Sequence, residues 1–453
     1  MAQKKSITIQ ELPSDFTPDR LSPALFEMPY FFLLESSLPG RRGRYTIAGV
    51  NPLTVYEAKN PGDDPFSFLK QKLAKGPVVE GLEDLPFAGG WVGFLGYELY
   101  SLLEQKIVPR EPDLIPRAVF GFYDHFYVYD HEKSEAKVVS IDLGQGAWGL
   151  LEGPRTCLSP SIKNINLGEF RRTWKEAPGS LPAVKSNFSQ NSYLSTIQRI
   201  KNYITAGDCY QVNLAQRFSC AAPDSPYEIY QRLRAVSPSP FAAFLNLGGA
   251  QILSSSPESF LEVNGREVLS HPIKGTRPRG KTLEEDLNLK GELEACPKDR
   301  AELLMITDLL RNDLGRVCEP GSISVPDLRT VETYPQVHHL VATIKGRLAV
   351  GQDVIDLLKA TFPGGSITGA PKVRAMQIIR ELEPDPRNVY CGAIGLISLN
   401  QKACFNVAIR TMILKDHQAT FWAGGGIVAD SDPEAEYQET LVKAEGMRRA
   451  LVH

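Results

Sequence analysis

The sequence from Glu258 to Gly280 reads ESFLEVNGREVLSHPIKGTRPRG and contains short apolar runs, a turn pair and a basic end. Two short apolar runs, Phe260-Leu261 and Val268-Leu269, are typical of β-strands. The pair Asn264-Gly265 lies between them and is one that a tight hairpin turn favours. The stretch therefore predicts an antiparallel hairpin.

This hairpin brings an acid and an amine toward each other. Glu258 is near the start of the first strand and Lys274 near the end of the second, and in an antiparallel pair those ends lie side by side. Gly275 allows the backbone to approach a ligand closely, and Arg277–Gly280 leaves the strand as a basic loop. We expect Glu258 and Lys274 to reach one cavity. The alternative is a surface hairpin with a solvated lysine.

The composition of the chain excludes some classes of function. Its 453 residues include 50 Lys and Arg and 53 Asp and Glu, a net charge of −3, which does not indicate a general nucleic-acid binder. The hydrophobic share of 42% and the mean hydropathy of −0.19 are typical of a soluble enzyme. Met1–Ser6 leads into polar sequence rather than a signal peptide, and Met28–Leu34 is too short to span a membrane. We expect a cytoplasmic protein that binds neither nucleic acid nor a membrane.

The cysteines and histidines predict neither a disulfide framework nor a zinc site. The seven cysteines are scattered without a Cys-x-x-Cys pair, which indicates mostly buried thiols in a reducing compartment. The seven histidines also lack ligand spacing, and the adjacent His338-His339 would point to opposite faces of a strand. A metal here would need carboxylate ligands, which favour magnesium.

Changes in composition divide the chain into three parts. We expect an N-terminal region at residues 1–150, a linker rich in Gly, Pro and Ser at residues 151–187, and a C-terminal region at residues 188–453. In the first part, Phe87–Tyr97 alternates glycine with large apolar residues, which indicates a closely packed strand. Phe120–Tyr129 is predicted to be one aromatic strand.

Helical patterns begin the third part and recur through it. Ser189–Thr205 has apolar residues at helical spacing, and Asp299–Arg311 is a strong helix with a core stripe. Asp299 and Glu302 have the spacing of a capping box, so the alternative role for Glu302 is a helix cap.

Another helix is predicted to begin at Asp432, a favourable N-cap residue. Three of its side chains share one face: Glu436, Glu439 and Lys443. The alternative is a solvated acidic face. Against it, the helix directly follows Gly424–Gly426, whose N–H groups could form a nest for an anion such as a carboxylate. Arg410, expected on a strand Phe405–Met412, would pair with such a carboxylate.

A glycine-rich segment, Phe362–Lys372, resembles a phosphate loop only superficially. Ala370 follows where that motif requires lysine, and no apolar strand leads into the segment. We interpret it as a glycine loop that leads into the helix Lys372–Glu381.

Several long motifs, taken in their order, resemble the chorismate-utilising enzymes. They are PIKGT at 272–276, RAE at 300–302, DLLRNDLGR at 308–316, FPGGSITGAPK at 362–372, AGGGIVADS at 423–431 and EYQET at 436–440. This family includes the large subunits of anthranilate synthase and aminodeoxychorismate synthase, isochorismate synthase and salicylate synthase. The resemblance is dense from Ser189 to the C-terminus and looser through Leu33–Ser37 and Gly89–Tyr97. It implies an α+β fold of two large antiparallel sheets packed as a sandwich with helices outside, the N- and C-terminal regions being interwoven.

Two positions separate the members of the family. Anthranilate synthases carry alanine where this chain has Lys274, whereas aminodeoxychorismate synthases carry the lysine. Isochorismate- and salicylate-forming members place a general-base lysine where this chain has Gln211. The resemblance therefore implies conversion of chorismate toward 4-aminobenzoate and folate.

The resemblance also implies the roles of individual residues. The catalytic residues are Lys274 and Glu258, the residues that bind chorismate are Gly275, Thr276, Tyr390, Arg410, Gly424, Gly425, Gly426, Lys443 and His339, and the residues that hold Mg²⁺ are Glu302, Glu439 and Glu436. Neutral Lys274 attacks C2 of chorismate while protonated Glu258 helps the 4-hydroxyl to leave. We therefore expect a lowered pKa for Lys274 and a raised pKa for Glu258.

Partners follow from the same resemblance. The sequence has no recognisable glutaminase nucleophile motif, so a separate glutamine amidotransferase subunit is expected to supply ammonia. Family members bind tryptophan at a second site, which here corresponds to Ser36, Gly43, Arg44, Tyr45, Thr46, Pro240, Phe241 and Ala242. Two other functions stay open: anthranilate synthase component I, opposed by Lys274, and a non-catalytic tryptophan- or chorismate-binding regulator.

Overall fold

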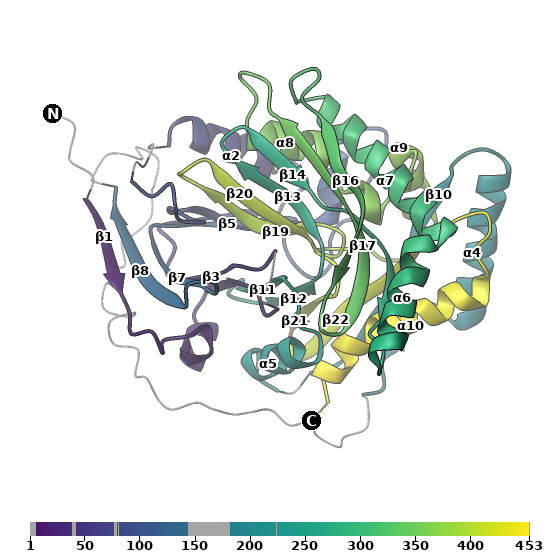
Figure 1. Ribbon diagram of the computed structural model, residues 1–453, viewed down its shortest axis with the longest axis horizontal. Coiled ribbons are helices and arrows are strands. Elements are labelled where there is room, and N and C mark those ends of the chain that lie inside the picture. The colour runs from purple at the N-terminus through teal and green to yellow at the C-terminus, as the bar shows by residue number, and fades with distance from the viewer. Residues whose placement is uncertain are drawn as a thin grey trace.

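The structure, a computed structural model, describes residues 6–452 except 39–41, 77–78, 80, 144–181 and 223. In this part of the chain, antiparallel strands form two large sheets (Figure 1). The first has twelve described strands, in the spatial order β1 (Ser6–Glu11), β8 (Glu135–Asp142), β7 (His125–Asp130), β3 (Tyr45–Gly49), β2 (Phe32–Glu35), β11 (Phe241–Asn246), β12 (Gln251–Ser256), β21 (Thr411–Lys415), β22 (Gln418–Ile427), β10 (Gln211–Ala221) and β18 (Gly369–Ala370), with β9 (Lys185–Ser186) on β10.

The second sheet has ten strands among the described residues. Their order is β15 (Ile273–Pro278), β17 (Val337–Arg347), β14 (Glu267–Ser270), β13 (Ser259–Asn264), β20 (Lys402–Val407), β19 (Ala393–Ser398), β5 (Gly90–Leu95), β6 (Ala118–Tyr123) and β4 (Thr54–Ala58), with β16 (Ser324–Thr333) also on β17. The predicted α+β fold with two antiparallel sheets is confirmed.

Helices lie on the outside of the two sheets (Figure 1). They are α1 (Pro23–Phe26), α2 (Pro65–Ala74), α3 (Tyr100–Leu103), α4 (Gln190–Thr205), α5 (Pro226–Val236), α6 (Leu283–Ala295), α7 (Pro297–Gly315), α8 (Val354–Thr361), α9 (Lys372–Leu382) and α10 (Pro433–Ala450), with short 3₁₀ turns η1 (Pro18–Arg20), η2 (Tyr97–Leu99) and η3 (Gly365–Ile367). α5 and α10 pack on the first sheet, α4 and α9 on β10, and α6 and α7 on the β15–β17 end of the second sheet.

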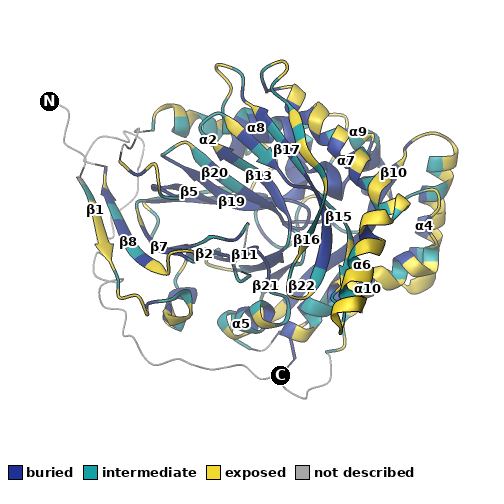
Figure 2. Cartoon of the chain, in the orientation of Figure 1, coloured by how far each residue is buried: buried dark blue, intermediate teal, exposed yellow. Residues whose placement is uncertain are grey.

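The alternation of side chains along the strands builds two apolar layers. In β2, Phe32 joins the core between the sheets, whereas the next residue, Leu33, packs beneath α5 and α10. The central strands are accordingly buried on both faces, and the outer helices expose one face to solvent (Figure 2). A sandwich covered by helices explains why many strands are apolar throughout rather than alternating.

The chain passes directly from one sheet to the other at several points. β6 lies in the second sheet and β7 in the first, with only Asp124 between them. The predicted single strand Phe120–Tyr129 is therefore wrong: it is the end of β6 and most of β7. The run of aromatic residues is continuous because both strands face apolar surroundings, so hydrophobicity alone does not mark the crossover.

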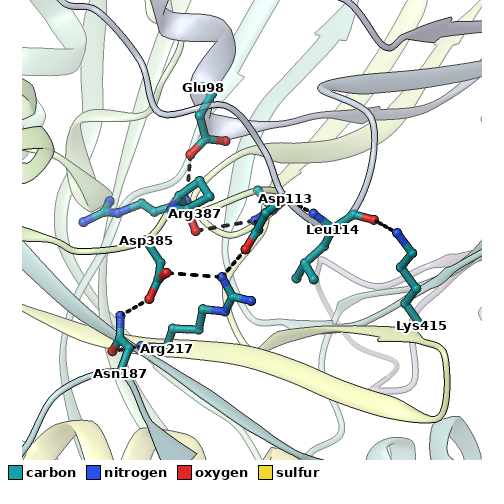
Figure 3. Close-up of polar contacts among 10 residues, drawn as sticks. Glu98, Asp113, Leu114, Asn187, Arg217, Asp385, Arg387 and Lys415 are labelled. Atoms are coloured by element: carbon teal, nitrogen blue, oxygen red, sulfur yellow. Dashed lines mark hydrogen bonds and ion pairs between the residues drawn. The ribbon is translucent and has the colours of Figure 1, made fainter.

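Strands from the N-terminal and C-terminal parts of the chain mix in both sheets, with β2 pairing with β11 and β5 with β19. Polar contacts also join the N-terminal and C-terminal parts of the chain (Figure 3). Arg217 bridges Asp113 at 2.6 Å and Asp385 at 3.7 Å, and the Lys415 ammonium donates to the Leu114 carbonyl at 2.9 Å. The division at residues 150 and 188 stays a prediction, and residues 151–181 of the predicted linker lie outside the described residues.

The predicted helices are present, with one difference in capping. Ser189 caps α4 and Asp432 caps α10, each through its side chain. The capping box predicted for Asp299 and Glu302 is wrong, because α7 begins earlier, at Pro297. A proline at the first position of a helix needs no backbone partner, so the helix starts there and both acids lie inside it.

Six cysteines fall within the described residues, and all six are free thiols, four of them buried. Within the same residues, no helix combines the length and apolar character needed to cross a membrane.

Candidate active site

The hairpin predicted around Lys274 is present, with its turn one residue further along. Asn264 pairs with Glu267, so the two-residue loop is Gly265-Arg266 rather than Asn264-Gly265. Gly265 has a φ of 61°, a conformation that glycine adopts without strain.

Lys274 lies beyond this hairpin, near the start of the next strand rather than at the end of β14. After a break at His271-Pro272, β15 continues along the same partner strand as β14, so that Lys274 pairs with Leu340 of β17. The lysine thus comes from the end of the second sheet on which α6 and α7 pack.

Glu258 lies at a crossover between the two sheets, after β12 and before β13. Its carbonyl accepts a hydrogen bond from Val407 N–H at 3.0 Å, and its side chain is buried. Burial raises the pKa of the Glu258 carboxyl, opposed by hydrogen bonds to the Ser366 side chain and the Ile273 backbone and by the charge of Lys274. The contact with Ile273 places this acid one residue away from Lys274 along β15.

The Lys274 amine is held without an ion pair among the described residues. Its Nζ donates to the Ser366 carbonyl at 3.2 Å. Burial lowers the pKa of Lys274, and the carboxylates of Glu302 and Glu258 oppose that effect. The directions expected for both pKa values, lowered for Lys274 and raised for Glu258, agree with the structure.

A group of charged side chains on α10 faces the glycines of β22. A Cβ added at Gly425 would lie 3.2 Å from Glu436 Oε2, 3.9 Å from Glu439 Oε2 and 3.8 Å from Lys443 Nζ. Lys443 also contacts Glu439 Oε1 at 2.8 Å and donates to the Gly424 carbonyl at 3.1 Å. The absence of a side chain at Gly425 therefore leaves a space that polar groups surround.

Glu302 faces this group from α7. Burial raises the pKa of Glu302, while Lys274 and Lys298 act to lower it and Glu436 acts to raise it. Lys298, one turn before Glu302 on α7, reaches within 3.8 Å of Glu436 Oε1 on α10. The acids of the two helices thus belong to one electrostatic cluster.

These acids fit magnesium better than a metal that needs a complete protein cage. Within the described residues, no three acidic, histidine or cysteine side chains are close enough together to hold a metal ion by themselves. Magnesium needs only one or two carboxylates, because it retains several waters and takes oxygens from the substrate. Binding of Mg²⁺ by Glu302, Glu439 and Glu436 stays a prediction.

The three glycines of β22 do not form the predicted nest. Gly424–Gly426 is extended strand paired with β10, so its N–H groups alternate in direction instead of converging. The glycines are needed for close packing: a Cβ at Gly424 would lie 2.4 Å from the Leu214 carbonyl oxygen, and one at Gly426 would lie 1.9 Å from Gln211 Nε2.

Arg410 lies in the connection between β20 and β21 and not on one continuous strand as predicted. Its φ of 48° is unusual for a residue with a side chain. Burial lowers the pKa of its guanidinium, and none of the described residues forms an ion pair with it. A partly buried cation without a carboxylate partner is suited to an anionic ligand.

The residues that follow Lys274 lie beside His339. Gly275 has a φ of 76°, and a Cβ there would meet Asp299 Cγ at 2.7 Å. Thr276 Oγ1 and His339 Nδ1 are 2.9 Å apart. Burial and the charge of Arg410 lower the pKa of His339 to about 4, so the ring is neutral at pH 7.

Tyr390 belongs to an aromatic stack between the two sheets. Its ring lies parallel to Trp422 of β22, with 6.1 Å between centroids, and the Arg387 guanidinium lies 5.7 Å from its centroid. Tyr390 is thereby tied to the strand that carries Gly424–Gly426.

The residues predicted to bind tryptophan come together in a different place, at one end of β2, β3 and β11. β2 pairs with β3 on one side and with β11 on the other, with Ala242 opposite Glu35. Gly43 packs so closely that a Cβ would lie 1.8 Å from Ser36 Oγ. The Arg44 guanidinium forms an ion pair with the Asp130 carboxylate at 2.8 Å. Tryptophan binding itself stays a prediction.

Two residues of the site were not predicted from the sequence. Ser366 contacts both Lys274 and Glu258, and Lys298 lies beside Glu436. Lys298 stands four residues before Glu302, a spacing that could have indicated a shared helix face. No local signal distinguishes Ser366 from the rest of its glycine-rich segment.

Comparison with known proteins agrees with the motifs. The chorismate binding enzyme family matches residues 30–449. The chain is 40% identical over 382 residues to aminodeoxychorismate synthase component 1 of Klebsiella aerogenes, covering 84% of this chain and 81% of the relative. It is 38% identical over 443 residues to anthranilate synthase component 1 of Streptomyces coelicolor, covering 93% and 83%.

Solved structures share the fold. Anthranilate synthase component I of Streptococcus pneumoniae TIGR4 has a TM-score of 0.78 and 34% identity, covering 95% of this chain and 98% of that one. The isochorismate synthase MenF of Escherichia coli has a TM-score of 0.75 at 18% identity, which shows the fold alone. The resemblance stated from the sequence is confirmed, and the chain belongs to the family of chorismate binding enzymes.

Proposed function

We propose that this chorismate-utilising enzyme replaces the 4-hydroxyl of chorismate by an amine and forms 4-amino-4-deoxychorismate, the precursor of 4-aminobenzoate and folate. The observation that carries this proposal is Lys274. Its amine has a lowered pKa, no ion-pair partner among the described residues, and an acid with a raised pKa beside it. A neutral amine next to a protonated carboxyl is the pair that nucleophilic substitution of a hydroxyl requires.

The reaction proceeds through a covalent intermediate. The lone pair of the Lys274 amine forms a bond to C2 of chorismate, both conjugated double bonds of the ring shift by one position, and the bond from C4 to its oxygen breaks. Glu258 transfers its proton to that oxygen, which leaves as water. Ammonia then forms a bond to C4 and gives one proton back to Glu258, the two double bonds shift back, and Lys274 leaves C2 as the free amine. The sum is chorismate plus ammonia giving 4-amino-4-deoxychorismate plus water.

The two carboxylates of chorismate have separate binding partners in this proposal. One carboxylate is bound by Arg410 together with Tyr390 and the Gly424–Gly426 strand. The other residues that line the site are Gly275, Thr276, His339 and Lys443. Glu302 and Glu439, supported by Glu436, hold Mg²⁺ for the ring carboxylate. The bound ion would neutralise that carboxylate and orient the ring against Lys274.

A separate glutamine amidotransferase subunit would supply the ammonia, as the names of the component 1 relatives suggest. Free ammonium should replace that subunit in the test tube. Tryptophan at the site of Ser36 and Pro240, and a cytoplasmic location, stay predictions.

A second candidate is anthranilate synthase component I, because several similar relatives carry that name. The same site would then aminate C2 and release pyruvate, and Lys274 would have another role. The third function considered, a non-catalytic regulator, is disfavoured because Glu258, Lys274, Glu302 and Glu439 are all present.

The deciding experiment incubates the protein with chorismate, Mg²⁺ and ammonium and follows the products by mass and by anthranilate fluorescence. A non-fluorescent aminated product with the mass of 4-amino-4-deoxychorismate supports the proposal. Formation of anthranilate and pyruvate supports the second candidate, and no turnover supports the regulator.

A further inference from the structure

Ser366 contacts both of the residues that the proposed reaction needs. It lies in η3, in the glycine-rich segment between α8 and α9, and is buried. Its carbonyl accepts from Lys274 Nζ at 3.2 Å, and its side chain lies beside the Glu258 carboxyl, where it acts to lower the pKa of that group. One residue thus touches the amine through its backbone and the acid through its side chain.

The segment that carries Ser366 is held firmly on both sides. Arg387 Nη1 donates to the Ile367 carbonyl at 3.1 Å, and Thr368 Oγ1 donates to the Gly364 carbonyl at 2.9 Å. At the end of the segment, Lys372 forms a buried ion pair with Asp313. Because several buried contacts fix the segment, Ser366 has one defined position from which to orient other groups.

We propose that Ser366 is a positioning residue: it holds the Glu258 carboxyl and the Lys274 amine in the relative position that the substitution at chorismate requires. This inference rests on the proposed function and adds to it a residue to which neither the family motif nor the comparisons assign a role.

The two contacts have different consequences. The N–H that Lys274 donates to the Ser366 carbonyl orients the nitrogen, and so fixes the direction of the lone pair that the amine uses once it is unprotonated. In this proposal the Ser366 hydroxyl donates to one oxygen of the Glu258 carboxyl, so the other oxygen stays available for the proton that the departing hydroxyl needs. A small misplacement of an acid relative to a leaving group is costly for the rate while leaving substrate binding intact.

The test separates the hydroxyl from the backbone carbonyl. Ser366→Ala keeps the carbonyl and removes the hydroxyl, and Ser366→Thr keeps both. With chorismate, Mg²⁺ and ammonium, we expect kcat of Ser366→Ala to fall about 10-fold or more, with KM for chorismate within about twofold of wild type. Ser366→Thr should retain kcat within about threefold.

A matched control comes from the same segment. Thr368→Val removes the hydroxyl that holds Gly364 but touches neither Glu258 nor Lys274. We expect this variant to lower the melting temperature more than it lowers kcat. If Ser366→Ala has too little folded protein to assay, Ser366→Cys, with its weaker hydrogen-bonding thiol, should show the same fall in kcat at unchanged KM.

The outcomes separate this inference from the proposed function. Wild-type kcat in Ser366→Ala, or an equal fall in Thr368→Val, overturns the role of Ser366 while the proposed function stands. A wild-type protein that forms no 4-amino-4-deoxychorismate overturns the proposed function and this inference with it.

Discussion

Two arginines of this protein, the buried Arg387 and the half-buried Arg410, are placed in opposite electrostatic surroundings. Arg387 donates to both oxygens of Glu383, at 2.6 and 2.9 Å, and also to the backbone carbonyls of Ile367 and Asn213. Arg410 forms no ion pair with any described residue. Burial opposes the charge of both, but the Glu383 carboxylate keeps the pKa of Arg387 well above its usual value, whereas that of Arg410 is lowered.

The difference separates charges that the chain itself pairs from charges that, in the proposed function, a ligand pairs. Around Arg387 the chain supplies the partner for its own cation, so the group is satisfied in the free protein. Around Arg410 and Lys274 the chain supplies burial without an ion pair. Such groups cost stability in the free protein, and an anionic or electrophilic ligand recovers that cost on binding.

The largest expected effect concerns the unpaired amine. Lys274→Ala should lower turnover of chorismate with ammonium by about 10³-fold or more, because it removes the nucleophile of the proposed substitution. Intact-mass analysis of wild type incubated with chorismate and Mg²⁺ without ammonium should show an adduct that the variant lacks. An active Lys274→Ala variant would mean that the unpaired lysine is not the nucleophile.

Breaking the paired arginine should affect stability rather than chemistry. We expect Arg387→Met to lower the free energy of unfolding by about 3–5 kcal/mol, since Glu383 would be left buried without its partner. Urea denaturation would measure the change. The double variant Arg387→Met, Glu383→Gln should recover part of the loss, and no loss in the single variant would contradict the pairing argument.

Removing the unpaired arginine should have the reverse pattern. Arg410→Met should weaken chorismate binding by about 10- to 100-fold, because a hydrogen bond to a charged group contributes about that much to affinity. The free energy of unfolding should stay equal or rise. The change in binding is measured as the KM for chorismate, and the change in the free energy of unfolding is measured by urea denaturation of the same variant. A loss of stability like that of Arg387→Met would remove the distinction between the two arginines.

The smallest effect is the dependence of stability on pH. Because burial lowers the pKa of Lys274 in the folded protein, the unfolded chain binds more protons between that lowered pKa and the ordinary lysine value. The contribution of Lys274 to the free energy of unfolding should therefore rise with pH across that window. Lys274→Met should be more stable than wild type at pH 7, with a difference that shrinks toward pH 10.5; Lys345→Met, at a half-exposed surface lysine, is the control. A difference that does not change with pH would show that Lys274 carries no such shift.

Local patterns in the sequence predicted elements that depend on near neighbours. The caps at Ser189 and Asp432, the hairpin before Lys274 and the face shared by Glu436 and Glu439 all involve residues within a few positions of one another. The aromatic run at Phe120–Tyr129 was misinterpreted because burial on both faces hides the point at which a chain changes sheets.

The order of motifs in the sequence was sufficient to identify the family and its fold, since that information is carried along the chain. The three-dimensional structure alone decided which charges have partners: Glu258 meets Ser366 across more than a hundred residues, Arg387 meets Glu383 in the connection that follows α9, and Arg410 meets no carboxylate among the described residues. The physical reason is that a pKa depends on burial and on charges close in space, and both are set only when two sheets and their helices pack together.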